Sequence, residues 1–368
     1  MLNIILDLIV ISALGSIVVY GMGQLWAYLE WTETGQDRTD FVTTNDGWRI
    51  AIHRYLPRGK TIGKPVILCH GLASNRFIFD LRPAPSLAEF LRANGHDVWV
   101  AELRGSGFSE RPGILLSDSP ASWGFDDHLN YDVSAILQHV IRETGHPSVH
   151  WVGHSMGGML IEAYIARNQP DHIASAVAIG APADFSKMGD HSFRPLLRVK
   201  WVFKILQFNP LIPIVKFGLP FAKLVPDMLS VFFCVQNIKW SIARKIAAIG
   251  AETVSSTALW LDMARFLTDG KWADRSGSSY IQDLDASKIP LLAICGTKDR
   301  MAPKNATLAV CQNEAPSVVR EGVVLGKETG SVQDYGHFDL LIGTRAGEEV
   351  FPIIEKWIGR WDTGVDED

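Results

Sequence analysis

The feature that most constrains the fold of this 368-residue chain is a serine flanked by glycines, in the run Val152 to Gly158. The apolar segment Ser148 to Val152 before it is typical of a buried strand, and the segment Met159 to Tyr164 after it is typical of a helix. A Gly-x-Ser-x-Gly sequence between a strand and a helix predicts a sharp, strained turn, the nucleophile elbow, with Ser155 exposed at its tip. The alternative, a glycine-rich turn with an incidental serine, does not account for the flanking strand and helix.

Strand patterns alternate with helical patterns along much of the chain. Around the turn Asn45-Asp46-Gly47, residues 40–44 and 48–55 indicate a hairpin. Further strands are expected at Pro65–Cys69, Asp97–Leu103, Val149–Val152, Ala174–Ile179, Pro290–Cys295 and Val318–Leu325, and helices at Ser86–Asn94, Tyr131–Glu143 and Phe351–Trp361. Apolar strands separated by helices predict an α/β fold, with a mostly parallel central sheet and helices on both faces. Reactive groups in such a sheet gather at the carboxyl ends of the strands.

The alternation stops after the sixth expected strand. Between residues 185 and 285 the chain is rich in Phe, Leu, Ile and Trp, and its pieces Leu196–Phe208, Pro213–Phe233 and Lys239–Ala248 resemble short helices. We expect residues 185–285 to form a helical cap over the edge of the sheet that carries Ser155, between core segments 38–184 and 286–368. A purely structural helical lobe is the alternative.

The N-terminal segment is strongly apolar. From Leu8 to Leu29 the chain carries no formal charge, and a helix of that length would cross a bilayer core of about 30 Å. Trp26, Tyr28 and Trp31 would then lie at the membrane interface. We predict a membrane-anchor helix over residues 1–30, and therefore a single-pass, membrane-anchored protein. A hydrophobic helix docked on the domain is the alternative, and the flanking charges are too few to orient the chain.

Composition narrows the range of partners. With 47% hydrophobic and 20% charged residues the chain can bury a large core. A net charge of −5, without a dense cluster of Lys and Arg, argues against nucleic-acid binding. The four cysteines are widely spaced and form no CxxC pair, so we expect buried thiols and no metal site. The sequence does not indicate an oligomeric state.

A serine hydroxyl becomes a good nucleophile only when a base takes its proton and an acid orients that base. His337, in the loop after the last expected strand, is the predicted base for Ser155. Asp299 directly follows a strand and is the predicted acid, and Asp184, after the preceding strand, is the alternative. Asp339 is too close in sequence to His337 to orient its ring and is expected to be structural.

A second loop is expected to bind the negative oxygen of a tetrahedral intermediate. The run His70-Gly71-Leu72 follows a strand, and its glycine allows the backbone N–H of Leu72 to point at that oxygen together with the N–H of Met156. We expect His70, Gly71 and His154, beside these groups, to contact the substrate.

Taken together, these segments resemble the α/β-hydrolase superfamily, and over about residues 40–180 and 288–345 the chain is similar to its acid lipase branch. The resemblance rests on Asn45–Ile50, His70–Ser74, Asp97–Val100, Tyr131–Asp132, Gly153–Ser155 and Tyr335–Asp339. Two stretches depart from acid lipases: Met156-Gly157-Gly158, as in monoacylglycerol lipases and many bacterial esterases, and Arg104 to Gly107. An acid pH optimum and triacylglycerol specificity are therefore not carried over.

The residues and the resemblance lead to one expected function, a serine hydrolase that cleaves carboxylic esters of lipid-like or apolar acyl groups without a cofactor or metal. An acyltransferase, a thioesterase or an amidase would use the same three residues and stays an alternative. A non-catalytic, membrane-tethered binding protein on a hydrolase scaffold is the alternative from another class. Dehalogenases and epoxide hydrolases are disfavoured because they need Asp where this chain has Ser155.

Overall fold

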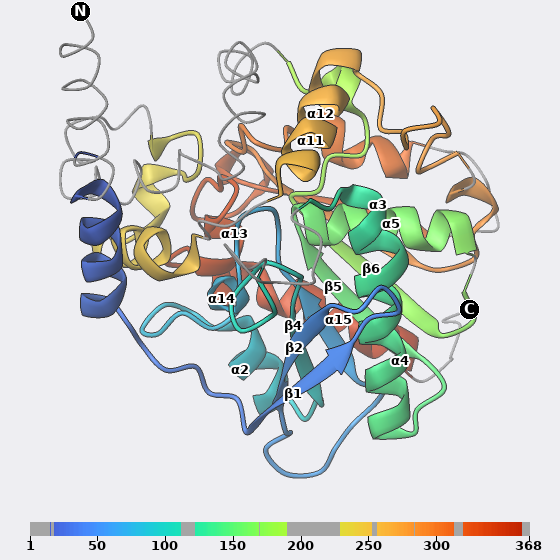
Figure 1. Ribbon diagram of the computed structural model, residues 1–368, viewed down its shortest axis with the longest axis horizontal. Helices are drawn as coiled ribbons and strands as arrows, with labels where there is room; N and C mark the ends of the chain where they lie inside the picture. The colour runs from blue at the N-terminus through green and yellow to red at the C-terminus, as the bar shows by residue number, and fades with distance from the viewer. Residues whose placement is uncertain are drawn as a thin grey trace, which may run out of the picture.

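The computed structural model describes residue 15 and residues 18–111, 122–168, 170–189, 229–251, 256–282, 284–312 and 319–362. Within these residues the chain forms one eight-stranded sheet in the order β1-β2-β4-β3-β5-β6-β7-β8. Figure 1 shows this sheet with helices packed around it. The strands are β1 (Arg38–Thr43), β2 (Arg49–Tyr55), β3 (Val66–Cys69), β4 (Val98–Glu102), β5 (Val149–His154), β6 (Ile173–Ile179), β7 (Leu291–Gly296) and β8 (Arg320–Leu325). β2 pairs antiparallel with β1 and β4, and the remaining neighbours are parallel. The predicted fold class, with a mostly parallel central sheet, is confirmed.

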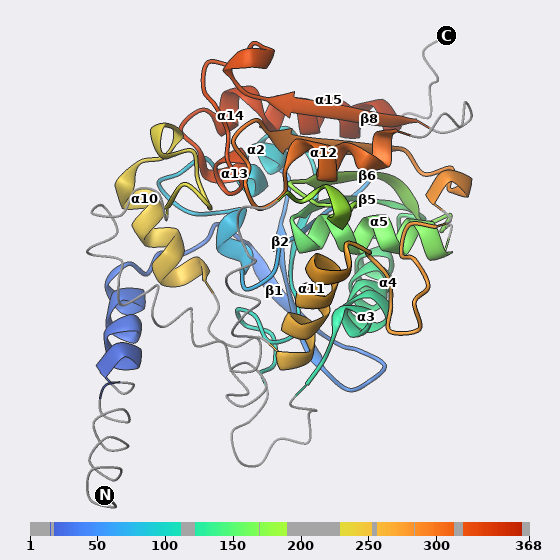
Figure 2. The same cartoon turned by 90° about the horizontal axis from the view of Figure 1, so that it is seen from above.

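Helices cover both faces of the sheet (Figure 2). One face is covered by α2 (Leu87–Ala93) and α15 (Phe351–Asp362), and the other by α4 (Val133–Thr144) and α5 (Met156–Asn168). Further α-helices in the described residues are α3 (Phe125–Asp127), α10 (Trp240–Lys245), α11 (Thr257–Asp269), α12 (Lys304–Thr307), α13 (Asp339–Ile342) and α14 (Ala346–Glu349). Short 3₁₀ and π turns are η1 (Arg76–Ile78), η2 (His128–Asp132), η3 (Phe185–Lys187), η5 (Val235–Asn237), η6 (Ile246–Gly250), η7 (Leu284–Ala286), η8 (Leu308–Cys311) and η9 (Lys327–Thr329).

The central strands are buried on both faces, because alternate side chains of a strand point to opposite sides of the sheet. In β5, Trp151 packs into the core under α4 and α5, while its neighbour Val152 packs into the core under α2 and α15. Both side chains are fully buried. This two-sided burial explains why these strands appear in the sequence as continuous apolar runs rather than as alternating ones.

The insertion between β6 and β7 contributes to both cores. The stretch 229–250, with α10 and η6, packs beside α2 and α15, whereas α11 packs beside Phe125 on the opposite side of the sheet. The helix expected at Lys239–Ala248 is formed by α10 and η6. The helices expected at Leu196–Phe208 and at Pro213–Phe233 lie outside the described residues, apart from residues 229–233.

The prediction of a membrane-anchored protein with a single-pass N-terminal helix is wrong. Along the described parts of the chain no helix has both the length and the apolar character that crossing a membrane requires. The expected span Leu8–Leu29 falls partly on residues 8–14, 16 and 17, which lie outside those parts.

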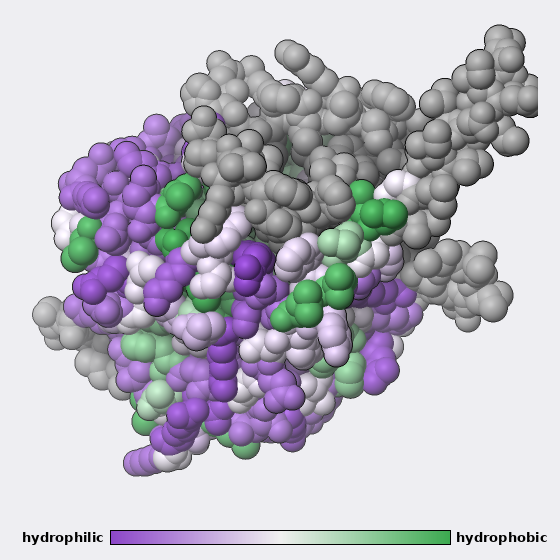
Figure 3. All heavy atoms as spheres, turned by 90° about the vertical axis from the view of Figure 1, so that its left-hand side faces the viewer, coloured by the Kyte–Doolittle hydropathy of each residue, from purple (hydrophilic) through white to green (hydrophobic). Residues whose placement is uncertain are grey.

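The described N-terminal residues are held against the domain instead. Glu30 forms an ion pair of 2.6 Å with Arg244 of α10, and the Trp31 ring packs edge-on against Phe77. Trp26 is partly buried against the core under α2 and α15. Figure 3 shows the face that carries this helix, on which apolar side chains form separate groups among hydrophilic ones.

Candidate active site

The turn at Ser155 has the strained geometry that its sequence predicts. Ser155 lies between β5 and α5 with a backbone φ of 54°, a left-handed value that is uncommon for a residue with a side chain. A Cβ on Gly157 would lie 2.2 Å from the carbonyl oxygen of Cys69, and one on Gly153 would lie 2.2 Å from Gly157. The two glycines are therefore required by close packing, and the turn is held by the Ser155 N–H, which donates to the carbonyl oxygen of Ile179 over 2.8 Å.

The structure brings the predicted base and the predicted acid together. His337 Nδ1 donates to Asp299 Oδ2 over 2.8 Å, and both side chains are buried. The other oxygen of Asp299 accepts from the backbone N–H groups of Met301 (2.9 Å) and Ala302 (2.7 Å), which fixes the carboxylate. Because Nδ1 carries the donated proton, Nε2 of His337 is left as an acceptor, and it has no hydrogen-bond partner among the described residues.

The alternative acid is engaged elsewhere. Asp184 accepts from the N–H (3.0 Å) and the hydroxyl (2.6 Å) of Ser186 and forms an ion pair of 3.2 Å with Lys187. Burial alone would raise the pKa of Asp184, but these partners outweigh it and lower the pKa. Of the two aspartates, only Asp299 bonds to His337 in the described part of the chain.

Asp339 has a structural setting, as expected from its position. Its carboxylate accepts from the N–H of Gly336 (3.0 and 3.1 Å), the N–H of Cys234 (3.0 Å) and the side-chain amide of Asn237 (3.2 Å). Burial raises its pKa to about 6 despite these bonds. Asp339 thereby ties the loop of His337 to the insertion between β6 and β7.

The predicted oxyanion loop lies directly against the elbow. A Cβ on Gly71 would lie 2.7 Å from Cβ of Ser155, so only glycine fits there. His70 is buried, its Nδ1 donates to the Gly71 carbonyl oxygen over 2.8 Å, and its Nε2 accepts from the N–H of Leu103 over 3.1 Å. Burial lowers the pKa of His70 to about 4, so the ring is neutral and supports the loop from behind.

The two predicted oxyanion donors belong to the loop after β3 and to the start of α5. Leu72 follows Gly71 in the loop and is half-buried. Met156 is the first residue of α5, and the first N–H groups of a helix have no acceptor within it. The helix dipole adds a partial positive charge at the same place, which favours an anion.

His154, predicted to contact substrate, is fully buried beside His337. Its Nε2 donates to the backbone carbonyl oxygen of His337 over 3.2 Å, and the two ring centroids are 4.7 Å apart. The structure therefore places His154 behind the predicted base, in contact with its backbone.

Sequence reasoning missed Gly180. This residue follows β6 with a φ of 56°, and a Cβ there would lie 3.1 Å from His337 Nδ1 and 3.2 Å from Asp299 Oδ2. Glycine thus leaves room for the histidine–aspartate pair. The available signal was a glycine directly after a strand end, where the reactive groups of such a sheet gather.

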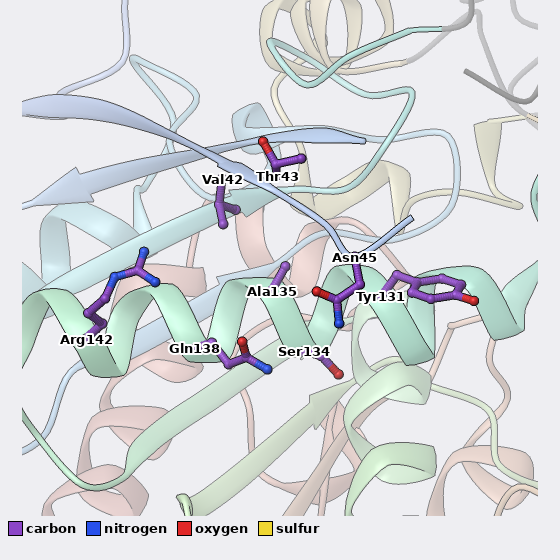
Figure 4. Close-up of a pocket in the computed structure, with 8 residues that line it drawn as sticks. All are labelled: Val42, Thr43, Asn45, Tyr131, Ser134, Ala135, Gln138 and Arg142. Carbon is purple, nitrogen blue, oxygen red and sulfur yellow. The ribbon is translucent and has the colours of Figure 1, made fainter. Parts of the chain in front are cut away.

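A pocket lies elsewhere on the molecule, between β1 on one side and η2 and α4 on the other (Figure 4). It is lined by Val42, Thr43, Asn45, Tyr131, Ser134, Ala135, Gln138 and Arg142. None of these residues belongs to the candidate site around Ser155.

Curated relatives of the chain include lipases. Lipase 1 of Drosophila melanogaster is 33% identical over 158 residues, which cover 41% of this chain and 35% of that protein. Lipase lipl-1 of Caenorhabditis elegans is 24% identical over 366 residues, 85% of this chain and 86% of that protein. The chain spans about a third of the length of the first curated relatives it matches.

Solved structures and family models agree on the architecture. A thermophilic esterase from Thermogutta terrifontis, described with malate bound, superposes with a TM-score of 0.58 at 19% identity, over 89% of this chain and 100% of that one. A family model described as the alpha/beta hydrolase fold matches residues 64–344. Because that match spans most of the chain and includes the elbow and the loop of His337, the chain belongs to the alpha/beta hydrolase fold family.

Proposed function

We propose that the chain is a serine hydrolase that cleaves carboxylic esters through an acyl-enzyme on Ser155. The observation that carries this proposal is the geometry of His337, whose Nδ1 is bonded to Asp299 at 2.8 Å while its Nε2 is left without a partner in the described structure. The backbone of His337 is bonded to His154, the residue before the serine. Acyl transfer requires a base with one nitrogen held by a carboxylate and the other left to accept a proton, together with an exposed serine, and a strained turn supports the second condition at Ser155.

The proposed reaction has two steps of the same kind. In the first, Ser155 Oγ forms a bond to the ester carbonyl carbon as its proton passes to His337 Nε2, and the tetrahedral intermediate expels the alcohol, which takes that proton. In the second, a water molecule loses a proton to Nε2 and attacks the acyl-enzyme, and the tetrahedral intermediate releases the acid as Nε2 passes that proton to Ser155 Oγ. Asp299 holds the ring in the required tautomer, and the N–H groups of Leu72 and Met156 stabilise the negative oxygen. The mechanism requires no cofactor or metal.

Apolar acyl groups are the proposed substrate class. Phe338, next to the base, lies 5.2 Å from the His337 ring and 5.6 Å from Phe233, and Phe232 lies 6.2 Å from Phe338. Phe232 and Phe338 are half-buried, so part of each ring is open. This aromatic wall (Phe232, Phe233 and Phe338) supports a preference for longer acyl chains, because each buried methylene contributes about 0.8 kcal/mol.

Residues 185–285 are proposed to cap this site. In support, Phe338 N–H donates to the carbonyl oxygen of Phe232 over 3.1 Å, and the Thr344 N–H donates to that of Asn237 over 2.8 Å. The insertion is therefore bonded to the same loop that carries His337. Its apolar side chains would shield the acyl-enzyme from bulk water.

The first test is labelling with a fluorophosphonate probe and turnover of p-nitrophenyl butyrate. Wild-type protein should be labelled, and Ser155→Ala should lose both labelling and turnover while it keeps the thermal unfolding midpoint of the wild type. Ser155→Ala protein that retains more than a few per cent of the turnover would overturn the assignment.

Chain-length preference tests the substrate class separately. We expect kcat/KM to rise severalfold from the acetate to the octanoate ester of p-nitrophenol, measured below the concentration at which the esters aggregate. Phe338→Ala should reduce that ratio while the acetate rate changes less. A steady fall of kcat/KM from acetate upward would contradict the apolar acyl pocket and leave a small-ester hydrolase.

A further inference from the structure

The side chain before the proposed nucleophile bonds to the loop that carries the proposed base. His154 is the last residue of β5 and is fully buried. Its Nε2 donates to the backbone carbonyl oxygen of His337 over 3.2 Å, across 183 positions of the chain. Because His154 and Ser155 are adjacent, this bond links the position of the serine to the position of the base.

Ring packing strengthens the same link. The centroids of His154 and His337 are 4.7 Å apart, with the ring planes inclined at 51°. The Phe338 ring lies 5.5 Å from His154 and 5.2 Å from His337. The three rings pack against one another between the end of β5 and the loop, so a tilt of His337 would press on His154.

The charge state of His154 suits this position. Burial, together with the nearby His337, lowers its pKa well below the usual value, so the ring is neutral near neutral pH. A neutral ring that donates from Nε2 has no proton on Nδ1, and Nδ1 lacks a partner among the described residues. When His337 takes the serine proton it becomes a cation, and a neutral neighbour does not repel it.

We propose that His154 is a positioning residue, which holds the backbone of His337 at a fixed place relative to Ser155 so that Nε2 faces the serine hydroxyl. The inference rests on the proposed function. It gives His154 a role behind the reacting groups, with no contact to substrate. A displacement of a reacting group by about 1 Å can lower the rate about 100-fold. The single hydrogen bond from His154 to the His337 backbone can therefore have a large effect on kcat.

Two substitutions at position 154 separate the hydrogen bond from the packing. His154→Gln can place an N–H donor near the position of Nε2, whereas His154→Leu keeps an apolar side chain without a donor. His150→Leu is the matched control, because His150 lies in the same strand, is equally buried and bonds to Ser175 and Asp362 at the opposite end of the sheet.

The measurement is kcat per active site on p-nitrophenyl butyrate, with sites counted by fluorophosphonate labelling carried to completion. We expect His154→Leu to lower kcat about 10- to 100-fold with little change in KM, and His154→Gln to stay within about threefold of wild type. His150→Leu should leave kcat per site unchanged. A merely structural role would reduce the number of labelled sites without changing kcat per site.

The outcomes separate this inference from the function on which it rests. If His154→Leu does not fold, His154→Met takes its place as the variant without a donor. A donor-free variant with wild-type kcat, or a His154→Gln variant as slow as His154→Leu, would overturn the positioning role. Turnover by Ser155→Ala would overturn the proposed function itself, whatever position 154 does.

Discussion

Near each end of strand β5 a histidine is bonded to an aspartate, but the two histidines differ in whether their second nitrogen has a partner. At the amino end, His150 Nδ1 lies 2.8 Å from Ser175 Oγ, and His150 Nε2 lies 3.0 Å from Asp362 Oδ1. At the carboxyl end, His337 Nδ1 bonds to Asp299 at 2.8 Å, and Nε2 has no partner among the described residues. We call these the basal cluster (Ser175, His150, Asp362) and the candidate triad (Ser155, His337, Asp299).

The two serines also differ, in exposure and in backbone conformation. Ser175 lies within β6 with none of its surface exposed, so no substrate can reach its hydroxyl. Ser155 lies on a left-handed turn and is half-buried. The comparison teaches that residue types alone do not make a nucleophile. The serine also needs a backbone that exposes it, and the histidine needs a nitrogen without a structural partner, so that it can accept the serine proton.

Removing each serine should separate the clusters most clearly. Ser155→Ala should lower kcat about 10⁴-fold or more, because the members of a triad act as a unit. Ser175→Ala should leave kcat within about twofold and lower the free energy of unfolding by about 1 kcal/mol, since His150 loses one partner. Ester turnover and urea unfolding of both variants measure the two effects. Equal losses of turnover in Ser155→Ala and Ser175→Ala would contradict the assignment of Ser155, and not Ser175, as the nucleophile.

The second-largest difference in kcat is expected between substitutions of the aspartates. Asp299→Asn should lower kcat about 10⁴-fold, the loss that a wrong ring tautomer causes in the triad of serine proteases. Asp362→Asn and Asp184→Asn should stay within about threefold of wild type, because neither side chain contacts His337. Steady-state kinetics on one soluble ester compares all three. A large loss in Asp184→Asn with a small loss in Asp299→Asn would move the acid to the strand before the insertion.

Each cluster also has a glycine against its carboxylate, which allows a smaller and sharper test. Gly180 has a φ of 56° and Gly63 a φ of 63°. An alanine at either position would be in the left-handed region, which should destabilise the folded state by about 1–2 kcal/mol in both variants. A Cβ on Gly180 would lie 3.2 Å from Asp299 Oδ2, and one on Gly63 would lie 1.9 Å from Asp362 Oδ2.

We expect Gly180→Ala to lower kcat about 10-fold by displacing the histidine–aspartate pair by a few tenths of an ångström. Gly63→Ala should lower the thermal unfolding midpoint at least as much as Gly180→Ala does. It should leave kcat unchanged. Kinetics and thermal unfolding of the two variants, side by side, provide the check. A loss of kcat in Gly63→Ala would mean that the basal cluster influences the reaction from the far end of β5.

Local sequence patterns predicted the parts of the molecule that depend on neighbouring residues. The strand, the two glycines and the helix around Ser155 are contiguous, so one short run was enough to indicate the elbow. His337 and Asp299 could be predicted from chain order, because each follows a strand of a parallel sheet whose carboxyl ends meet at one edge.

Contacts between distant residues could not be predicted in the same way. Asp362 lies 212 positions from its partner His150, and nothing in either local segment indicates the other. The apolar run at the N-terminus led to the wrong prediction of a membrane span for a related reason. A charge-free run measures hydrophobicity, but it does not show that Glu30 pairs with Arg244 or that Trp31 packs on Phe77.

The basal cluster should make the stability of the fold depend on pH and should have no effect on turnover. Burial lowers the pKa of His150 below its usual value of about 6.5. As the pH falls through about 6.5, the unfolded chain takes up a proton at this residue while the folded chain does not, so the folded state loses stability. Asp362 titrates at lower pH, because bonds from His150 and Lys64 outweigh burial and lower its pKa.

His150→Leu should remove that pH dependence. At pH 8 we expect the variant to be less stable than wild type by about 1–3 kcal/mol, because Ser175 and Asp362 lose a buried partner. The difference in the free energy of unfolding should shrink towards pH 5. Only the wild type has a histidine at position 150, so only the wild type is destabilised there when the unfolded chain takes up a proton. Urea unfolding at pH 5, 6, 7 and 8 measures the difference. A difference that stays constant over this range would show that His150 is no more than a packing residue, and a fall in kcat would show that the two ends of β5 are coupled.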